Sequence, residues 1–351
     1  MGEPHTGTWE SSRHHDGIDE QLGPSEQPGA LTDRGGRRDG SLWAIVLAGG
    51  EGVRLRRLVR HVCGDERPKQ FAPLVGSRSL LRATLDRVGL GIPSERTVVV
   101  AHGSHAGYLA DEKARGPLPR LIVQPGDRGT AAAVLLAAHW LSWRDPEATL
   151  ALFPSDHFVG NEPAFMDHVL GMAAFVRAEP EWAVLAGAVP TEAETEYGWI
   201  EPGARVGEVR GRPVHGVSKF VEKPPLDEAR AMVAGGWLWN TLVLVGRVAL
   251  LIEAGWRTLP ALSDRLARIK PFADSDDEAW ALQQAYLLAP KANFSHAVLE
   301  ACPSILAVSR LPATVSWSDW GTPDRVVRSF RGAKIVPPWL EEAERLGTAM
   351  A

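Results

Sequence analysis

The apolar run from Ile45 to Ala48, with the glycines directly after it, constrains the fold more than any other segment of the chain. A short apolar run that ends at a turn signal predicts a strand buried in a sheet. Glycines at the end of such a strand leave backbone N–H groups bare, so a polyphosphate can approach them closely. The glycines in this position are Gly49, Gly50 and Gly52. We therefore expect a strand that carries a phosphate-binding loop at its carboxyl end.

Two basic residues follow these glycines. Arg54 lies just beyond the last of them, and Lys69 follows a short basic loop within Pro68-Lys69-Gln70. Their positive charge favours a phosphate site over the alternative, which is a tight structural turn. The segment matches neither G-x-x-x-x-G-K-S/T nor G-x-G-x-x-G, because Val53 and Arg54 follow Gly52. The sequence therefore indicates phosphate binding by a loop of a different type.

Strand-like and helix-like segments alternate in the first half of the chain. Strands are expected at 44–47, 97–101, 121–123, 149–153 and 183–188, and helices at 80–88, 130–143 and 162–178. This order predicts an α/β fold, Rossmann-like, in which helices cover both faces of a mostly parallel mixed sheet. Beyond residue 190 we expect shorter strands at 198–201, 216–222, 241–246 and 305–308, a helix at 226–234, and mostly helix over 248–301.

Composition restricts the class of protein and its partners. Hydrophobic residues make up 44% and charged residues 23% of the 351 residues, as in ordinary globular proteins. The net charge of −5 gives no electrostatic reason to expect nucleic acid or an anionic membrane as a partner. No apolar run is long enough to span a bilayer. Cys63 and Cys302 form neither a disulfide framework nor a metal-type pair, which predicts a reducing, cytoplasmic location.

The two ends of the chain differ from the rest. Residues 1–40 contain almost no large apolar side chains, so we expect a disordered N-terminal tail that is not a signal peptide. His14 and His15 fit a solvated tail better than a metal site. Residues 331–351 are expected to form a short C-terminal tail.

The glycine loop and the segment that follows it resemble the signature of the sugar-nucleotide pyrophosphorylases, above all the mannose-1-phosphate guanylyltransferases. LAGGEGVRL is similar to that family's L-A-G-G-x-G-T-R-L, and PKQF is identical to its P-K-Q-F. The resemblance implies a glycosyltransferase-A-like nucleotidyltransferase fold over residues 42–330. It also implies that Leu47, Ala48 and the three glycines bind the nucleotide, and that Arg54 and Lys69 are catalytic.

This chain departs from the family signature in three places. Val53 stands where Thr is usual, Arg57 stands where Pro is usual, and the loop before Pro68 is a few residues longer. The residues that would contact phosphate are kept. These departures therefore leave the shape of the loop open.

Two aspartates are candidates for a Mg²⁺ site. Asp156 follows a predicted strand, at the edge where parallel sheets bind ligands. Mg²⁺ prefers one or two carboxylates together with phosphate oxygens and water. The alternatives are a helix N-cap for Asp156 and a turn residue for Asp319. Resemblance to the family's P-A-D-H and W-x-D-x-G implies that both bind the metal and that Asp156 is catalytic. For His157 we expect a structural or base-orienting role.

Three further segments resemble the sugar-binding part of the family. FVEKP is similar to F-x-E-K-P, which implies that Lys223 binds the sugar phosphate and Glu222 the sugar hydroxyls. A Glu-Lys pair alone is more often a solvated surface. YGWI is similar to Y-G-Y-I, which implies that substrate lies against the backbone at Gly198. In the family's W-N pair, the residue matching Asn240 contacts sugar hydroxyls.

The segment that the family uses to read the base is QPGDRGT here, where E-P-x-x-R-N-T is usual. The nucleotide-binding residues implied are Gln124, Gly129 and Thr130. Gln and Gly stand at such positions in related thymidylyl- and uridylyltransferases, so base identity stays open. Ser295 stands where an Asp linked to sugar binding is usual, which leaves the sugar open as well.

The resemblance implies that an NTP and a sugar 1-phosphate give an NDP-sugar and pyrophosphate, with Mg²⁺ as cofactor. GTP and mannose 1-phosphate are favoured. Residues 41–190 would form the nucleotide-binding half and residues 191–330 the sugar-phosphate half. One alternative is a pyrophosphorylase for glucose 1-phosphate with UTP, dTTP or ATP, and another is a catalytically silent, ligand-sensing homologue. The oligomeric state stays open, with a homo-oligomer among the alternatives.

Overall fold

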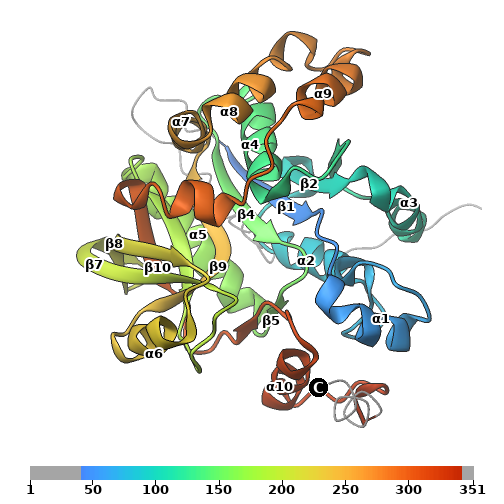
Figure 1. The fold of residues 1–351 in the computed structure, drawn as a ribbon. Helices are drawn as coiled ribbons and strands as arrows, with labels where there is room; N and C mark the ends of the chain where they lie inside the picture. Colours follow the sequence, from blue (N-terminus) through green and yellow to red (C-terminus); the bar gives the residue numbers. More distant parts are fainter. Residues whose placement is uncertain (1–40, 342–351) are drawn as a thin grey trace, which may run out of the picture. The chain divides into compact units, whose positions relative to one another are not determined.

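A nine-stranded mixed sheet runs through residues 41–341, the part of the chain that the computed structural model describes (Figure 1). The strand order is β3-β2-β1-β4-β9-β6-β10-β8-β7. The tail predicted over residues 1–40, and the end of the predicted C-terminal tail at 342–351, lie outside the described residues.

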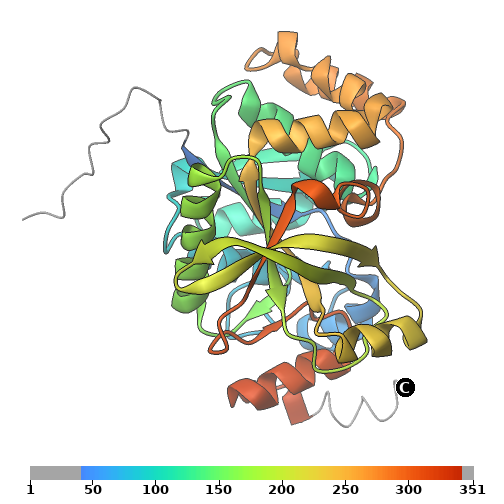
Figure 2. The same cartoon turned by 90° about the vertical axis from the view of Figure 1, so that its left-hand side faces the viewer.

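Every strand expected from the sequence is present. The strands are β1 (Leu42–Ala48), β2 (Thr97–His102), β3 (Arg120–Gln124), β4 (Thr149–Pro154), β6 (Ala183–Ala188), β7 (Gly198–Val209), β8 (Arg212–Glu222), β9 (Leu238–Arg247) and β10 (Leu306–Arg310). β7 and β8 are longer than expected and pair with each other as a long antiparallel ribbon (Figure 2). Only β8 and β9 run against the other strands, so the mostly parallel mixed sheet is confirmed.

Helices cover both faces of this sheet, as predicted. Successive residues of β1 point to opposite faces, with Ile45 in one apolar core and Ala44 and Val46 in the other. The helices of the first core are α4 (Gly129–Ser142), α7 (Val248–Thr258), α8 (Pro260–Ala267) and α9 (Glu278–Leu287). Those of the second are α2 (Leu80–Val88), α3 (Ala106–Arg115), α5 (Glu162–Ala178) and α6 (Leu226–Ala234). Within residues 41–341, no helix is long and apolar enough to cross a membrane.

Two helices without a sequence prediction support the loop after β1. These are α1 (Arg56–Cys63) and α10 (Pro323–Ala333), which lie side by side in Figure 1. The Thr322 hydroxyl accepts a hydrogen bond from the Arg325 N–H at 3.4 Å, so a Thr-Pro pair begins α10. Residues of both helices share a third apolar core with Trp320. This core brings the segment around Trp320 next to the glycine loop.

A two-stranded pair completes the same region. β5 (Phe158–Val159) pairs with β11 (Trp317–Ser318) in antiparallel register. β5 follows the end of β4, and β11 directly precedes Asp319. The pairing therefore brings the two predicted metal-binding segments to one side of the sheet.

Candidate active site

The carboxyl ends of β1, β2, β3 and β4 surround a cavity of about 390 Å³. Its lining includes most of the predicted nucleotide-binding residues, namely Leu47, Gly49, Gly50, Gln124, Gly129 and Thr130, together with Asp156. This is the edge at which open α/β sheets bind ligands. The topology thus gathers residues that lie far apart in the sequence.

The glycine loop is held by Gln70. The Gln70 amide nitrogen donates hydrogen bonds to the backbone oxygens of Ala48 at 3.1 Å and Gly50 at 2.8 Å. Gly52 has a φ of 60°, and a Cβ atom there would lie 2.9 Å from the backbone nitrogen of Lys69. Only glycine fits this position without strain, so Gly52 fixes the loop against the Lys69 segment.

Gln124 is oriented by a residue that the sequence analysis did not identify. The buried Tyr286 hydroxyl donates to Gln124 Oε1 at 3.0 Å, and burial raises the pKa of Tyr286, so the hydroxyl keeps its proton. A Cβ atom at Gly49 would lie 3.3 Å from Gln124 Nε2. The amide N–H groups of Gln124 therefore face the glycine loop. Nothing local in the sequence around Tyr286 signals this contact.

The amino end of α4 is fixed to a distant segment. Gly129 has a φ of 78°, and a Cβ atom there would lie 2.2 Å from the backbone oxygen of Ala292. The Thr130 hydroxyl accepts a hydrogen bond from the Phe294 N–H at 2.8 Å. The departure from the family's Asn at position 129 therefore has a steric reason in this chain, because only glycine fits.

Lys69 connects the two predicted metal-binding aspartates. Its ammonium group lies 3.2 Å from Asp156 Oδ2 and donates to the backbone oxygen of Asp319 at 2.5 Å. Lys69 is only 6% exposed, so this contact is poorly screened by water. A second cavity of about 340 Å³ lies beside this ion pair. Its lining residues are Glu51, Gly52, Val53, Arg54, Leu55, Lys69, Asp156, Trp320 and Gly321.

The Asp319 carboxylate has several partners. Its Oδ1 accepts hydrogen bonds from the Tyr197 hydroxyl at 2.6 Å and from the Gly321 N–H at 2.8 Å. Arg325 Nη1 donates to Oδ1 at 2.9 Å and to Oδ2 at 3.1 Å. Burial raises the pKa of Asp319, but the interactions with His157, Tyr197 and Arg325 outweigh burial and lower it. The carboxylate is therefore ionised at neutral pH.

His157 lies between the two aspartate segments. Its Nε2 is 3.7 Å from Asp156 Oδ1, and its ring makes an edge contact with Trp317 at 5.4 Å. Burial lowers the pKa of His157, so the ring is neutral at pH 7. A neutral ring that packs against Asp156 is compatible with the predicted orienting role.

The predicted sugar-binding residues also lie together. Gly198 in β7 pairs with Glu222 in β8, and a Cβ atom at Gly198 would lie 2.8 Å from Glu222 Oε2 and 3.2 Å from Asn240 Cβ. The backbone N–H of Lys223 donates to the backbone oxygen of Tyr197 at 3.0 Å. Burial raises the pKa of Glu222.

Glu196, which the sequence analysis did not identify, joins the two groups of residues. Its carboxylate lies 2.8 Å from Arg54 Nη1 and 3.9 Å from Lys223 Nζ. Arg54 belongs to the glycine loop and Lys223 to the predicted sugar-binding group. The two sets of predicted residues therefore lie next to each other, and an acidic side chain lies close to both cations.

The model of the nucleotidyl transferase family matches residues 43–333 of the chain. The chain belongs to this family. It is 32% identical to the xanthan biosynthesis protein XanB of Xanthomonas campestris, over 79% of this chain and 57% of that protein. It is 30% identical to the mannose-1-phosphate guanylyltransferase of Escherichia coli K12, over 80% of this chain and 58% of that protein. The chain thus spans less than two thirds of either relative's length.

A solved structure supports the same family. The crystal structure of mannose-1-phosphate geranyltransferase from Thermus thermophilus is 31% identical and superposes with a TM-score of 0.70. The match covers 83% of this chain and 79% of that one. The predicted sugar-nucleotide transferase family and its fold are therefore confirmed.

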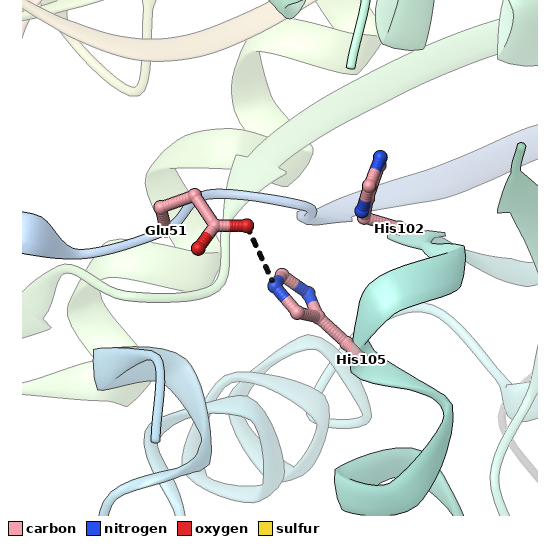
Figure 3. Close-up of side chains that lie close together, drawn as sticks. All are labelled: Glu51, His102 and His105. Atoms are coloured by element: carbon pink, nitrogen blue, oxygen red, sulfur yellow. Dashed lines mark hydrogen bonds and ion pairs between the residues drawn. The ribbon is translucent and has the colours of Figure 1, made fainter. Parts of the chain in front are cut away.

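This nucleotidyl transferase also carries a cluster that its sequence did not suggest. Glu51, His102 and His105 offer donor atoms that lie within 4.8 Å of one another (Figure 3). Glu51 and His102 line the larger cavity. Within residues 41–341, these three residues form a possible metal site that is separate from the predicted Asp156–Asp319 pair.

Proposed function

We propose that the chain transfers a nucleotidyl group from an NTP to a sugar 1-phosphate, releasing pyrophosphate. GTP and mannose 1-phosphate are the favoured substrates, with GDP-mannose as the product. The observation that carries this proposal is the Lys69–Asp156 contact, because Asp156 lines both cavities and Lys69 lines the second one together with Arg54. The name of the Escherichia coli relative favours both substrates, and the name of the Thermus thermophilus structure favours mannose 1-phosphate.

In the proposed reaction, an oxygen of the sugar phosphate attacks the α-phosphorus of the nucleotide. The new P–O bond forms as the bond between the α-phosphorus and the bridging oxygen breaks, and that electron pair leaves with pyrophosphate. The attacking phosphate is already ionised at neutral pH, so the protein supplies positioning and charge stabilisation and needs no nucleophile of its own. We assign charge stabilisation of the leaving group to Arg54 and Lys69.

On the acceptor side, we assign orientation of the sugar phosphate to Lys223. Its side chain is half exposed and lies near the carboxylate of Glu196. Glu222 and Asn240 would hold the sugar hydroxyls. Asn240 is 8% exposed, and its Oδ1 accepts a hydrogen bond from the Leu242 N–H at 2.9 Å, so its amide N–H groups remain available to a sugar.

Carboxylate oxygens are the ligands that Mg²⁺ prefers, and Asp156 and Asp319 both offer them. Asp156 lines both cavities, and within the described residues Oδ2 of Asp319 accepts a hydrogen bond from Arg325 alone. We propose that these two carboxylates would hold the ion together with phosphate oxygens and water. When bound, Mg²⁺ would neutralise charge on the phosphates.

Base identity rests on Gln124. Because Tyr286 occupies Oε1, the free amide N–H groups can donate to a carbonyl oxygen, which guanine, uracil and thymine all carry. The first alternative is glucose 1-phosphate with UTP, dTTP or ATP, and among these nucleotides the amide of Gln124 favours UTP and dTTP. The buried Ser295 leaves the sugar open. A silent ligand sensor is the second. The convergence of Arg54, Lys69 and Asp156 around one cavity favours an active enzyme.

The test is a substrate panel. The full chain is mixed with Mg²⁺ and each of GTP, ATP, UTP, dTTP and CTP, first with mannose 1-phosphate and then with glucose 1-phosphate. The NDP-sugar is identified by mass spectrometry. GDP-mannose as the main product supports the proposal. A different NDP-sugar would change the assigned base or sugar, and no product with any pair would favour the ligand sensor.

The described cysteines, Cys63 and Cys302, are free, which supports a reducing, cytoplasmic location.

A further inference from the structure

Three residues from separate positions meet at the rim of the larger cavity. Glu51 belongs to the glycine loop after β1, His102 ends β2, and His105 ends the short helix η4 (Gly103–His105). Figure 3 shows the Glu51 carboxylate and the His105 ring facing each other, with Glu51 Oε1 and His105 Nε2 3.3 Å apart. The rings of His102 and His105 are 5.7 Å apart.

Two ring nitrogens in this cluster lack a partner. His102 Nε2 and His105 Nδ1 are buried and make no hydrogen bond within the described part of the chain. His105 as a whole is only 2% exposed. A buried nitrogen without a partner costs free energy, and native structures usually satisfy such atoms with protein, water or an ion. The cluster therefore contains ring nitrogens that no hydrogen bond uses, and these lie close to a carboxylate.

We propose that Glu51, His102 and His105 form a binding site for a divalent transition-metal ion of the Zn²⁺ type. Imidazole nitrogens suit Zn²⁺, Fe²⁺ and Ni²⁺, whereas Mg²⁺ prefers oxygen ligands. The site is therefore chemically distinct from the Mg²⁺ site proposed at Asp156 and Asp319. Two imidazoles and one carboxylate leave a coordination position for water or for an oxygen of a bound phosphate.

Binding requires a small closure of the cluster. The donor atoms lie within 4.8 Å of one another, whereas bonds of about 2 Å to a shared ion bring donors closer together. Glu51 is exposed and sits in the glycine loop between Gly50 and Gly52, so it is the residue best able to move. The ion would then connect the glycine loop to η4, beside the larger cavity.

The test uses the full chain, freed of metal by dialysis against a chelator and free of nucleotide, because nucleotide phosphates bind metal themselves. Co²⁺ is the spectroscopic probe, and Zn²⁺ and Mg²⁺ compete with it. We expect Co²⁺ to bind with a visible absorption band, Zn²⁺ to displace it, and excess Mg²⁺ to leave it in place. His102→Gln, His105→Gln and Glu51→Gln should each weaken binding at least ~10-fold.

Two controls separate this site from other histidines. His215→Gln changes a histidine of β8 outside the cluster, and a double variant, His14→Gln with His15→Gln, removes the adjacent pair near the amino terminus. Both should bind Co²⁺ like the unchanged chain. Far-UV circular dichroism checks that each variant folds, and Glu51→Gln alters an exposed side chain, so it tests the site without opening the core.

Three results would overturn the proposal. They are unchanged Co²⁺ affinity in His105→Gln or Glu51→Gln, loss of binding in the double variant near the amino terminus, and displacement of Co²⁺ by Mg²⁺ as readily as by Zn²⁺. The readout is metal binding and not turnover. Failure here would therefore leave the proposed nucleotidyl transfer untouched, and inactivity in the substrate panel would not affect this test.

Discussion

The ammonium group of Lys69 lies 3.2 Å from the carboxylate of Asp156, in a position almost closed to water. The same ammonium group donates to the backbone oxygen of Asp319. One buried cation thus connects the segment after the glycine loop, the end of β4 and the segment before α10.

Asp156→Asn should lower kcat at least ~100-fold while the fold is preserved. The substitution removes the charge that faces Lys69 and the carboxylate proposed to hold Mg²⁺, and losing a single group that stabilises charge in a transition state typically costs about 10²–10³-fold. Steady-state pyrophosphate release measures kcat. Asp227→Asn, at an exposed position of α6, is the matched control. A near-normal rate in Asp156→Asn would remove Asp156 from the metal site.

Lys223→Ala should raise KM for the sugar phosphate ~10-fold or more and change KM for the nucleotide little. A hydrogen bond to a charged group contributes about 1.5–3 kcal/mol, and this one would be made only to the acceptor phosphate. Lys219→Ala removes an exposed lysine from β8, the strand that ends directly before Lys223, and serves as the control. If both variants give the same KM for the sugar phosphate, the assignment of Lys223 is wrong.

Tyr286→Phe should reduce discrimination between nucleotides by about 2–10-fold. Without the hydroxyl, Gln124 Oε1 loses its hydrogen bond, worth about 0.5–1.5 kcal/mol, and the amide can rotate. The measurement is kcat/KM for each nucleotide with a fixed sugar phosphate. Tyr108→Phe, whose ring stacks on Phe71 outside this contact, is the control. An unchanged ratio between nucleotides would show that Tyr286 does not set the orientation of Gln124.

Stability should fall in mild acid through His139. This buried residue of α4 has its pKa lowered by burial to about 4, so the unfolded chain binds the proton first as the pH falls below 6.5. The contribution to stability is complete above pH 6.5 and is lost as the pH falls toward 4, by about 2 kcal/mol between pH 7 and pH 5. Urea unfolding at both pH values measures it.

His139→Leu should reduce this dependence by the share of His139, because leucine takes up no proton. The share of the buried His168, whose pKa burial also lowers to about 4, should remain. His296→Leu, which changes an exposed histidine paired with Glu300, should leave the dependence unchanged. An equal loss of stability between pH 7 and pH 5 in the His139 variant and the unchanged chain would assign the acid sensitivity to other groups.

The sheet can be predicted well because its strands carry their own signals. The bounds predicted for Ala183–Ala188 and Glu162–Ala178 match those in the structure, since an apolar run and a capped helix are both local patterns. The antiparallel direction of β9 could not be predicted. It depends on pairing with β4 and β6, which lie far away in the sequence.

The site divides in the same way. Residues within short motifs, such as Gly52 and Lys69, could be proposed as site residues because the glycines, the nearby cations and the resemblance to a family signature are all visible in the sequence. The other contributors could not be identified, because each contacts a residue outside its own motif. They are Glu196, Tyr286 and Arg325. Their partners are set by tertiary packing. The Thr322-Pro323 pair could have indicated the start of α10, and with it the position of Arg325.

The most direct test of nucleotidyl transfer is the rate of pyrophosphate release by the purified full chain with Mg²⁺, GTP and mannose 1-phosphate. The account predicts steady release that requires both substrates and that yields one GDP-mannose for each pyrophosphate. Release that continues without the sugar phosphate would indicate nucleotide hydrolysis. No release with any nucleotide and either sugar phosphate would contradict the account.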